Sequence, residues 1–285
     1  MTAGLVSIDL GNLSEPATVL IERVSDAVGG IARPWQTRRV ASAEADAQII
    51  LAEADVKATD IRRRAALRFV EEETRNQANI ESITYQAIPH LSEDSNPGNV
   101  EDDFLRNFFD KCRLVSDEQM QDIWARILAG EANNPGKFSR KTINILEDMD
   151  NGDAELFSKL CCFVWRIHDT MTLLIADRME IFERNGINVT SLADVESLGL
   201  IQTATFPYSL TNLPKQVFAS YFERTVEITL KADAPADLEV GTVLLTRAGR
   251  QIGPMCQRKP IEDFFEVMCE KWEKDQRIES VRVLQ

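Results

Sequence analysis

The chain has 285 residues and a net charge of −14, with 44% hydrophobic and 27% charged residues. This length allows two domains, or one domain plus an extended element, and the composition is that of an ordinary globular protein. The acidic excess argues against a surface made for phosphate backbones, because nucleic-acid affinity comes largely from clustered Lys and Arg. A local basic patch is compatible with this average, but we expect no nucleic-acid partner.

Cysteine usage and hydropathy indicate the compartment. The cysteines are odd in number and form no C-x-x-C pair; they are Cys112, Cys161, Cys162, Cys256 and Cys269. This pattern is typical of a reducing compartment rather than a disulfide framework. The sequence also has no signal-peptide pattern at its start and no window of about 18 uninterrupted apolar residues. We therefore expect a cytoplasmic protein without a transmembrane helix.

Residues 14–32 predict an amphipathic helix that opens with a Ser14 cap and an early proline, Pro16. Such a helix could lie on a membrane surface. Its polar face carries Glu22 and Asp26 against a single Arg23, which suits anionic lipid poorly. We favour a helix that docks on protein.

Residues 37–88 contain neither Gly nor Pro, which favours one helix of roughly 75 Å at 1.5 Å per residue. Lys57, Arg64 and Arg68 would fall on the seam of a seven-residue repeat, and an 11-residue repeat fits better. The small and apolar seam residues that we expect to mediate self-association are Ala43, Ala47, Ile50, Ala54, Ala58, Ile61, Ala65 and Phe69. A lone helix of this kind is marginal, so either it folds against its own domain or copies pair with each other. We favour pairing of copies.

A basic run and an acidic run follow one another in this predicted helix. Arg62–Arg64 and Arg68 precede Glu71–Glu73. One interpretation is a site for nucleic acid or an acidic partner. The other is a solvated face with ion pairs worth a few tenths of a kcal/mol each. We prefer the solvated face, because the acidic run directly follows the basic one.

The clearest local signal runs from Ser116 to Glu131. Its apolar residues follow a helical stripe: Met120, Ile123, Trp124, Ile127 and Leu128. Ser116 and Gln119 have the spacing of a capping box, and Gly130 offers the left-handed residue that closes many helices. We therefore predict a helix bounded at both ends, whose stripe with Trp124 packs against a partner.

Further helices are expected on either side of this stretch. The turn-rich residues 92–98 predict a domain boundary, followed by short helices over 102–114 and 139–149. Apolar residues from Ala154 to about Arg184 trace a stripe that we interpret as one long core helix. His168 falls on this stripe, where a buried core histidine is the expected role.

The C-terminal residues change character after Gly186. A short helix leads into Leu198–Ile201, and two β-rich runs, Thr225–Leu230 and Gly241–Leu245, precede a Leu-Thr-x-x-Gly motif at 245–249. This order is typical of a winged-helix domain. The helix that would enter the DNA groove carries Asp194 and Glu196 and no Lys or Arg, so we expect protein contact rather than DNA binding.

Catalytic and cofactor motifs are not found. His90 and His168 lack metal-ligand neighbours at useful spacing, and no phosphate-binding loop or nucleophile elbow occurs. We expect no catalytic, cofactor or metal site, although carboxylates from distant helices could still assemble one.

Several segments resemble an uncharacterised bacterial family, domain of unknown function 2806. These segments are 43–47, 79–83, 115–120, 123–131 and 135–139. The resemblance implies no activity and no catalytic residues. The acidic cap before Trp124-Ala125 and the later Leu-Thr-x-x-Gly motif are also similar to abortive-infection alpha proteins, which act in bacterial defence against phage.

Together these patterns predict a mainly α protein. Its expected parts are an amphipathic helix at 1–36, a long helix at 37–92, a helical domain at 93–185 and a small winged-helix-like α+β domain at 186–285. The expected function is a non-enzymatic assembly protein that forms homo-oligomers and binds a protein partner. The alternatives are a winged-helix transcription regulator and an enzyme with an unrecognised carboxylate site.

Overall fold

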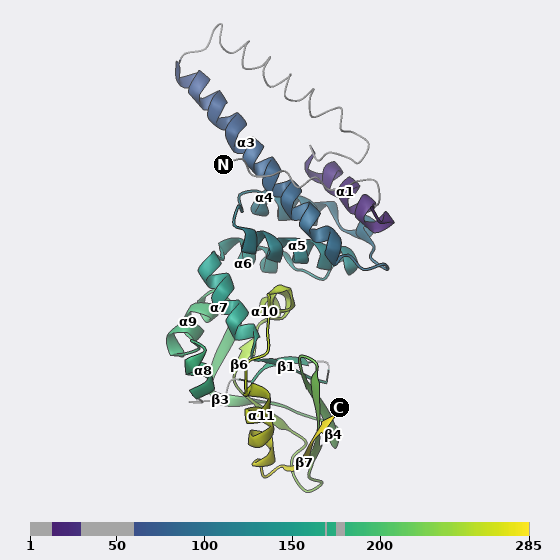
Figure 1. Cartoon of the computed structure of the whole chain (residues 1–285), viewed down its shortest axis with the longest axis vertical. Coiled ribbons are helices and arrows are strands. Elements are labelled where there is room, and N and C mark those ends of the chain that lie inside the picture. Colours follow the sequence, from purple (N-terminus) through teal and green to yellow (C-terminus); the bar gives the residue numbers. More distant parts are fainter. Residues whose placement is uncertain (1–12, 30–59, 169, 175–179, 285) are drawn as a thin grey trace. The chain divides into compact units, whose positions relative to one another are not determined.

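The computed structural model describes residues 13–29, 60–168, 170–174 and 180–284. The chain divides into two compact units, Met1–Ile143 and Asn144–Gln285, which we call unit 1 and unit 2. The described elements of unit 1 are helical, whereas unit 2 contains a five-stranded antiparallel sheet, a two-stranded sheet and several helices (Figure 1). The predicted fold class, mainly α with a small winged-helix-like C-terminal domain, is therefore wrong.

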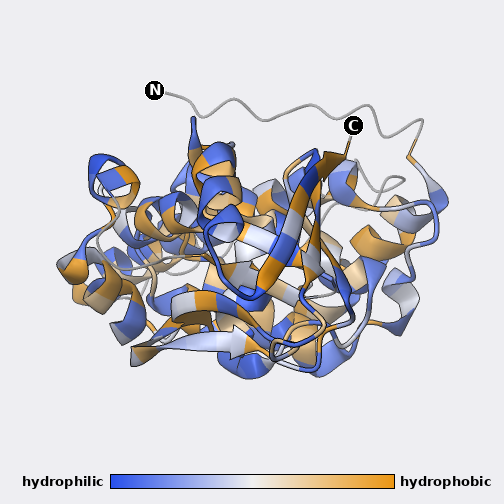
Figure 2. Cartoon of the chain, turned by 90° about the horizontal axis from the view of Figure 1, so that it is seen from below, coloured by the Kyte–Doolittle hydropathy of each residue, from blue (hydrophilic) through white to orange (hydrophobic). Residues whose placement is uncertain are grey.

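Unit 1 is built from amphipathic helices. Its elements are α1 (Glu15–Val28), α3 (Asp60–Ala87), η2 (Ile88–His90), η3 (Pro97–Asn99), α4 (Asp102–Cys112) and α5 (Glu118–Asn133), while α6 (Arg140–Asp148) spans the division between the units. Hydrophobic and hydrophilic residues follow one another along the ribbons (Figure 2). Phe108 of α4 packs edge-on against Trp124 of α5, with ring centroids 5.0 Å apart. Both side chains are fully buried, so this pair lies in the core of unit 1.

Helix α1 docks on this core. Ser14 accepts a hydrogen bond from the amide of Ala17, as the predicted N-cap should. The buried apolar residues of α1 face α4 and η3; they are Ala17, Leu20, Ile21 and Val24. Arg23 forms an ion pair with Asp102 at 2.8 Å. The apolar face that could have met a membrane is thus covered by protein within unit 1, for the part of 14–32 that the structure describes.

The helix predicted from Ser116 to Glu131 is present as α5, but both of its ends differ from the prediction. Asp117, not Ser116, is the N-cap, and its carboxylate accepts a hydrogen bond from the amide of Met120 at 2.9 Å. Gln119 lies half-exposed in the first turn. Gly130 does not close the helix, which continues to Asn133. Asp and Ser are equally good caps, so composition alone could not choose between neighbours.

Gly130 and Glu131 instead hold the turn that follows α5. A Cβ atom at Gly130 would lie 3.0 Å from the ring of Phe138, so a larger residue would require this ring to shift by a few tenths of an ångström. The buried Glu131 carboxylate accepts hydrogen bonds from the amides of Gly136 at 2.6 Å and Phe138 at 3.0 Å. These contacts fix the turn at 134–138 against α5 and explain the Gly-Glu pair as a packing device.

Unit 2 contains α7 (Asn151–Cys161), β1 (Val164–Ile167), β2 (Thr170–Leu173), α8 (Glu180–Arg184), α9 (Val189–Ser197), β3 (Ile201–Leu210), β4 (Gln216–Tyr221), β5 (Arg224–Leu230), β6 (Leu238–Leu245), α10 (Arg247–Ile252), η4 (Gly253–Met255), α11 (Phe264–Glu273) and β7 (Ile278–Leu284). The larger sheet has the order β2-β1-β4-β5-β7, and β3 pairs with β6 alone. Every pairing is antiparallel.

The long helix predicted from Ala154 to about Arg184 does not exist. Helix α7 ends at Cys161, and β1 and β2 form a hairpin in its place. His168 lies in the hairpin turn with a positive φ of 49°, not on a core helix. The run Phe163–Ile167 is rich in aromatic and β-branched residues, and such short apolar runs fit a helical period by chance while preferring strands.

The winged-helix prediction fails because the two β-rich runs belong to different sheets. Thr225–Leu230 lies within β5 and pairs with β4 and β7, whereas Gly241–Leu245 lies within β6 and pairs with β3. A short helix, a β-ribbon and a Thr246-capped helix do follow in the expected order. Strands β4 and β5 are inserted inside that ribbon, which makes unit 2 an α+β fold.

Helix α11 covers one face of the larger sheet with an aromatic cluster. The indole of Trp165 stacks on Tyr221 and on Phe265, and it meets Trp272 edge-on at 5.0 Å between centroids. Tyr221 uses its hydroxyl twice: it donates to the carbonyl of Cys162 and accepts from the amide of Ile261, both at 2.8 Å. Aromatic packing and paired polar tips together fix α11 on the sheet.

Replacing Glu131 by Ala should destabilise unit 1. The change leaves the buried amide of Phe138 and the partly buried amide of Gly136 without their acceptor, and an unsatisfied buried donor costs about 1–3 kcal/mol, so we expect a loss of about 1–3 kcal/mol. Denaturant unfolding followed by circular dichroism measures it. Glu93→Ala, at an exposed turn position, is the control and should change the unfolding free energy by less than about 0.5 kcal/mol. Equal losses in both variants would contradict this role for Glu131.

Burial raises the pKa of Tyr221 to about 12. Because the folded state resists deprotonation, the unfolding free energy should fall as pH rises above about 10, the ordinary tyrosine pKa. Absorbance titration of the phenols should show a component near 12 that Tyr221→Phe removes. A Tyr221→Phe chain that keeps the late component would contradict the assignment.

Candidate interaction surface on helix α3

Helix α3 has two halves in different surroundings. Its buried residues lie in the C-terminal part: Ile80, Ile83, Thr84 and Ala87. No residue from Asp60 to Asn79 is buried by the part of the chain that the structure describes. Within unit 1, this N-terminal half runs clear of α4 and α5 (Figure 1). The exposed half is the candidate interaction surface.

A polar network fixes the point where α3 leaves α5. The buried Gln121 of α5 accepts a hydrogen bond from the hydroxyl of Ser82 at 2.8 Å. Its amide nitrogen donates to the side chain of Asn79 at 3.1 Å and to the carbonyl of Val115 at 2.8 Å. Gln86 donates to Ser82 at 2.9 Å. Because every partner must be satisfied at once, the network sets the register of the two helices.

An apolar stripe continues from the buried half of α3 into the exposed half. Steps of 11 or 22 residues return to nearly the same side of an α-helix, so Phe69 shares a side with Ile80, and Ile61 with Ile83. Ile61 is 70% exposed and Phe69 is 66% exposed, with Ala65 between them also exposed. The side that packs on unit 1 at one end is therefore uncovered by described residues at the other.

Leu67 lies on a second side of α3. It is 45% exposed and stands about 160° from Phe69 around the helix, at about 100° per residue. The prediction from the 11-residue repeat did not include it, since it falls outside that repeat. Leu67 is therefore an exposed apolar residue on a side of α3 away from the stripe, and it can serve as a control position for Phe69.

Charged residues flank the stripe. Arg63 pairs with Asp60 at 2.8 Å and Arg68 pairs with Glu72 at 3.4 Å, both within the helix and both well exposed. Pairs of this kind contribute only a few tenths of a kcal/mol. Both blocks, Arg62–Arg64 and Glu71–Glu73, are exposed. The described ion pairs within α3 therefore contribute little to the stability of one chain. Exposed charges of both signs are well suited to determine which partner binds.

The predicted seam residues divide into two groups. Ile61, Ala65 and Phe69 share the exposed stripe described above. Those outside the described residues are Ala43, Ala47, Ile50, Ala54 and Ala58. Trp124 is a core residue of α5, and Ser116 is exposed beside the Asp117 cap. The sequence reasoning missed Gln121 and Glu131, whose polar side chains gave no signal of burial.

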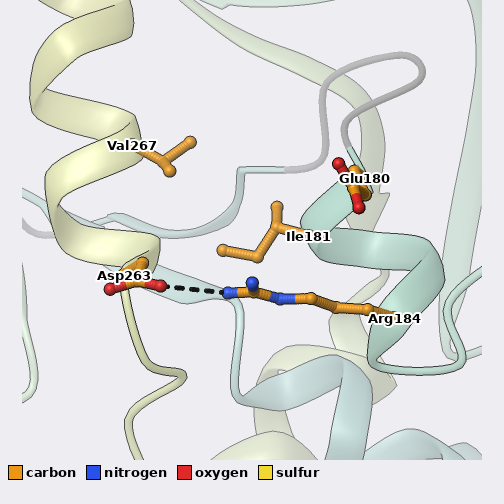
Figure 3. A pocket seen from close by; sticks show the side chains of 5 residues that line it. All are labelled: Glu180, Ile181, Arg184, Asp263 and Val267. Atoms are coloured by element: carbon orange, nitrogen blue, oxygen red, sulfur yellow. Dashed lines mark hydrogen bonds and ion pairs between the residues drawn. The ribbon is translucent and has the colours of Figure 1, made fainter.

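Unit 2 has an open surface depression beside α8 and α11. It has a volume of about 360 Å³ and is lined by Glu180, Ile181, Arg184, Asp263 and Val267. Arg184 reaches across it to the Asp263 carboxylate at 3.4 Å and to the carbonyl of Glu262 at 3.2 Å (Figure 3). Its lining contains no nucleophile beside a base, so it lacks the arrangement that acyl or phosphoryl transfer needs.

Burial disfavours the thiolate form of three of the cysteines. All five are buried. Burial raises the pKa of Cys112 and of Cys161, and it raises the pKa of Cys269 to about 11. Since the thiolate is the reactive form, these side chains are poor nucleophiles at neutral pH.

Among the described residues, no group of three or more His, Cys, Asp or Glu side chains could hold a metal ion. No described helix is both long enough and apolar enough to cross a membrane.

These features define an α+β protein with an exposed apolar stripe on the N-terminal part of α3, among the residues that the structure describes. The family model for proteins of unknown function (DUF2806) matches residues 63–269, and the chain belongs to this family. The match begins inside α3 and runs through the larger part of both units. No curated protein and no solved structure matches the chain.

Removing the Gln121 network should loosen α3 without unfolding unit 1. In Gln121→Ala, Ser82 and Asn79 each lose their hydrogen bond to Gln121, which costs about 1–3 kcal/mol, or roughly tenfold in local opening for each 1.4 kcal/mol. Hydrogen exchange measured over residues 79–87 should accelerate accordingly. The half-exposed Gln119 supplies the control, and Gln119→Ala should leave that exchange unchanged. Equal effects would argue against the network.

Proposed function

We propose that this chain is a non-enzymatic assembly protein that self-associates through the exposed half of α3. The observation that carries the proposal is the apolar stripe of Ile61, Ala65 and Phe69, which no residue within 13–29, 60–168, 170–174 or 180–284 covers. Covering a large apolar side chain stabilises a structure by about 1.5–3 kcal/mol, so this stripe provides a driving force for contact. Single exposed apolar residues are ordinary, but a stripe that continues a packed helical side marks a contact surface.

Helix energetics support the same proposal. Most helices in proteins gain their stability by packing an apolar side rather than from helix propensity alone. The stretch from Asp60 to Arg75 extends past the hydrogen bonds that Asn79 and Ser82 make to Gln121 of α5. A neighbouring helix against its stripe would supply the missing packing.

The residues that carry the family resemblance fill structural roles. Trp124 is in the core, and Glu131 with Gly130 holds the following turn. These residues stabilise the helical core against which the C-terminal part of α3 packs. A structural role for them is consistent with an assembly protein. The similarity of two short motifs to abortive-infection alpha proteins is the support for placing such an assembly in bacterial defence against phage.

Phe69→Glu should weaken assembly. A charge on the stripe removes apolar contact and must be desolvated in the contact, so we expect the dissociation constant to rise about tenfold or more. Light scattering over a concentration series should show the mass falling towards 32.1 kDa, the mass of one chain.

Leu67→Glu is the matched control, because it places the same charge on the other side of α3. It should leave the mass unchanged. A native chain that stays at 32.1 kDa at every concentration would overturn the proposed function. Loss of assembly in both variants would move the contact away from the stripe.

A further inference from the structure

We infer that two copies of α3 pair antiparallel through the stripe, around a two-fold axis that crosses the stripe at the level of the midpoint between residues 67 and 68. This inference rests on the proposed function and adds the orientation and register of the partner. The occupant of the exposed stripe is then a second copy of this chain, in an isologous contact where each copy presents the same surface.

The charge order of the helix favours this orientation. The centre of the basic block Arg62–Arg64 and the centre of the acidic block Glu71–Glu73 lie on either side of a midpoint between Leu67 and Arg68. Turning one helix end for end about that midpoint places each basic block beside the other copy's acidic block. A parallel pair would place basic beside basic and acidic beside acidic.

The positions of the charged residues around the helix axis favour the same antiparallel orientation as their order along it. Arg62 and Glu73 are 11 residues apart and lie on one flank of the stripe, and Arg64 and Glu71 are 7 apart and lie on the other. In an antiparallel pair of helices, each flank faces the same flank of its partner. Each flank carries one basic and one acidic position. In an antiparallel pair, the basic position of each flank therefore lies opposite the acidic position of the same flank in the other copy.

Two of the three stripe residues, Ala65 and Phe69, are compatible with this axis, whereas Ile61 lies towards one end of the overlap. Ala65 and Phe69 are centred on Leu67, within about half a residue of the charge midpoint. Around that axis the small Ala65 of one copy lies beside the large Phe69 of the other. Glu72 falls within the stripe, where its pairing with Arg68 at 3.4 Å offsets its charge.

The paired segment also fits the free length of α3. About this axis, Asp60 of one copy stands opposite Arg75 of the other. The overlap therefore ends before Ile80, where unit 1 begins to cover the helix. Such a contact is smaller than the roughly 1,200–2,000 Å² of a stable interface, so we expect a concentration-dependent equilibrium.

Charge exchange tests the orientation. The acidic variant carries Arg62→Glu, Arg63→Glu and Arg64→Glu; the basic variant carries Glu71→Lys, Glu72→Lys and Glu73→Lys; the exchanged variant carries all six. At low ionic strength, the acidic and basic variants should each assemble at least about tenfold more weakly than the native chain. The exchanged variant should regain native assembly, because every opposed pair is again unlike in charge. Circular dichroism controls for helix content, since all six side chains are exposed.

Mixing separates the two orientations. Labelled native chain and labelled exchanged variant should form separate assemblies, with energy transfer well below that of two native samples, because antiparallel mixing opposes like charges. In a parallel pair the same mixture would be complementary and would combine at least as readily as native with native.

Free mixing would overturn the antiparallel inference and leave the proposed function standing, provided that the native chain assembles. Block variants that assemble as the native chain does would also overturn it. A native chain that is a monomer at every concentration, as when another segment of the same chain covers the stripe, would overturn both.

Discussion

The amide of Gln121, buried between α5 and α3, is the contact on which the rest of unit 1 depends. Apolar contacts between two helices tolerate small slides, since one aliphatic surface resembles another. A primary amide that must satisfy Asn79, Ser82 and a backbone carbonyl together accepts only one register. That register decides which residues of α3 are covered and which remain exposed. The position of the apolar stripe on the molecule therefore follows from hydrogen bonds made elsewhere on the helix.

In unit 2, an aromatic packing contact joins a helix, α11, to one face of the larger sheet. Trp165 and Tyr221 offer broad rings from two neighbouring strands, and α11 meets them with Phe265 and Trp272. Large aromatic side chains cover wide areas with few rotatable bonds, so they specify an interface at a small cost in conformational entropy. The hydroxyl of Tyr221 adds direction that the rings lack.

The sequence was informative where apolar residues followed a single helical period. The amphipathic helix after Ser14 and the helix carrying Trp124 were predictable from their stripes, although both ends of the second helix were placed wrongly. The hairpin after Cys161 was not, since its continuous run of apolar residues satisfies more than one period. The pairing of β3 with β6 was also out of reach, because partners across an insertion leave no local pattern. In the candidate surface, Ile61 and Phe69 were identifiable from spacing, but whether they were covered depended on a tertiary contact.

Strand order in unit 2 has a consequence for synthesis on the ribosome. Strand β5 needs β7, which is translated only after β6, α10 and α11, so the larger sheet stays open at that side while these elements emerge. An unpaired strand exposes a row of amides and carbonyls that other chains can pair with. The helices of unit 1, by contrast, close their hydrogen bonds locally as they appear. Until β7 has formed, the nascent chain is therefore most vulnerable to misassociation along one edge of β5.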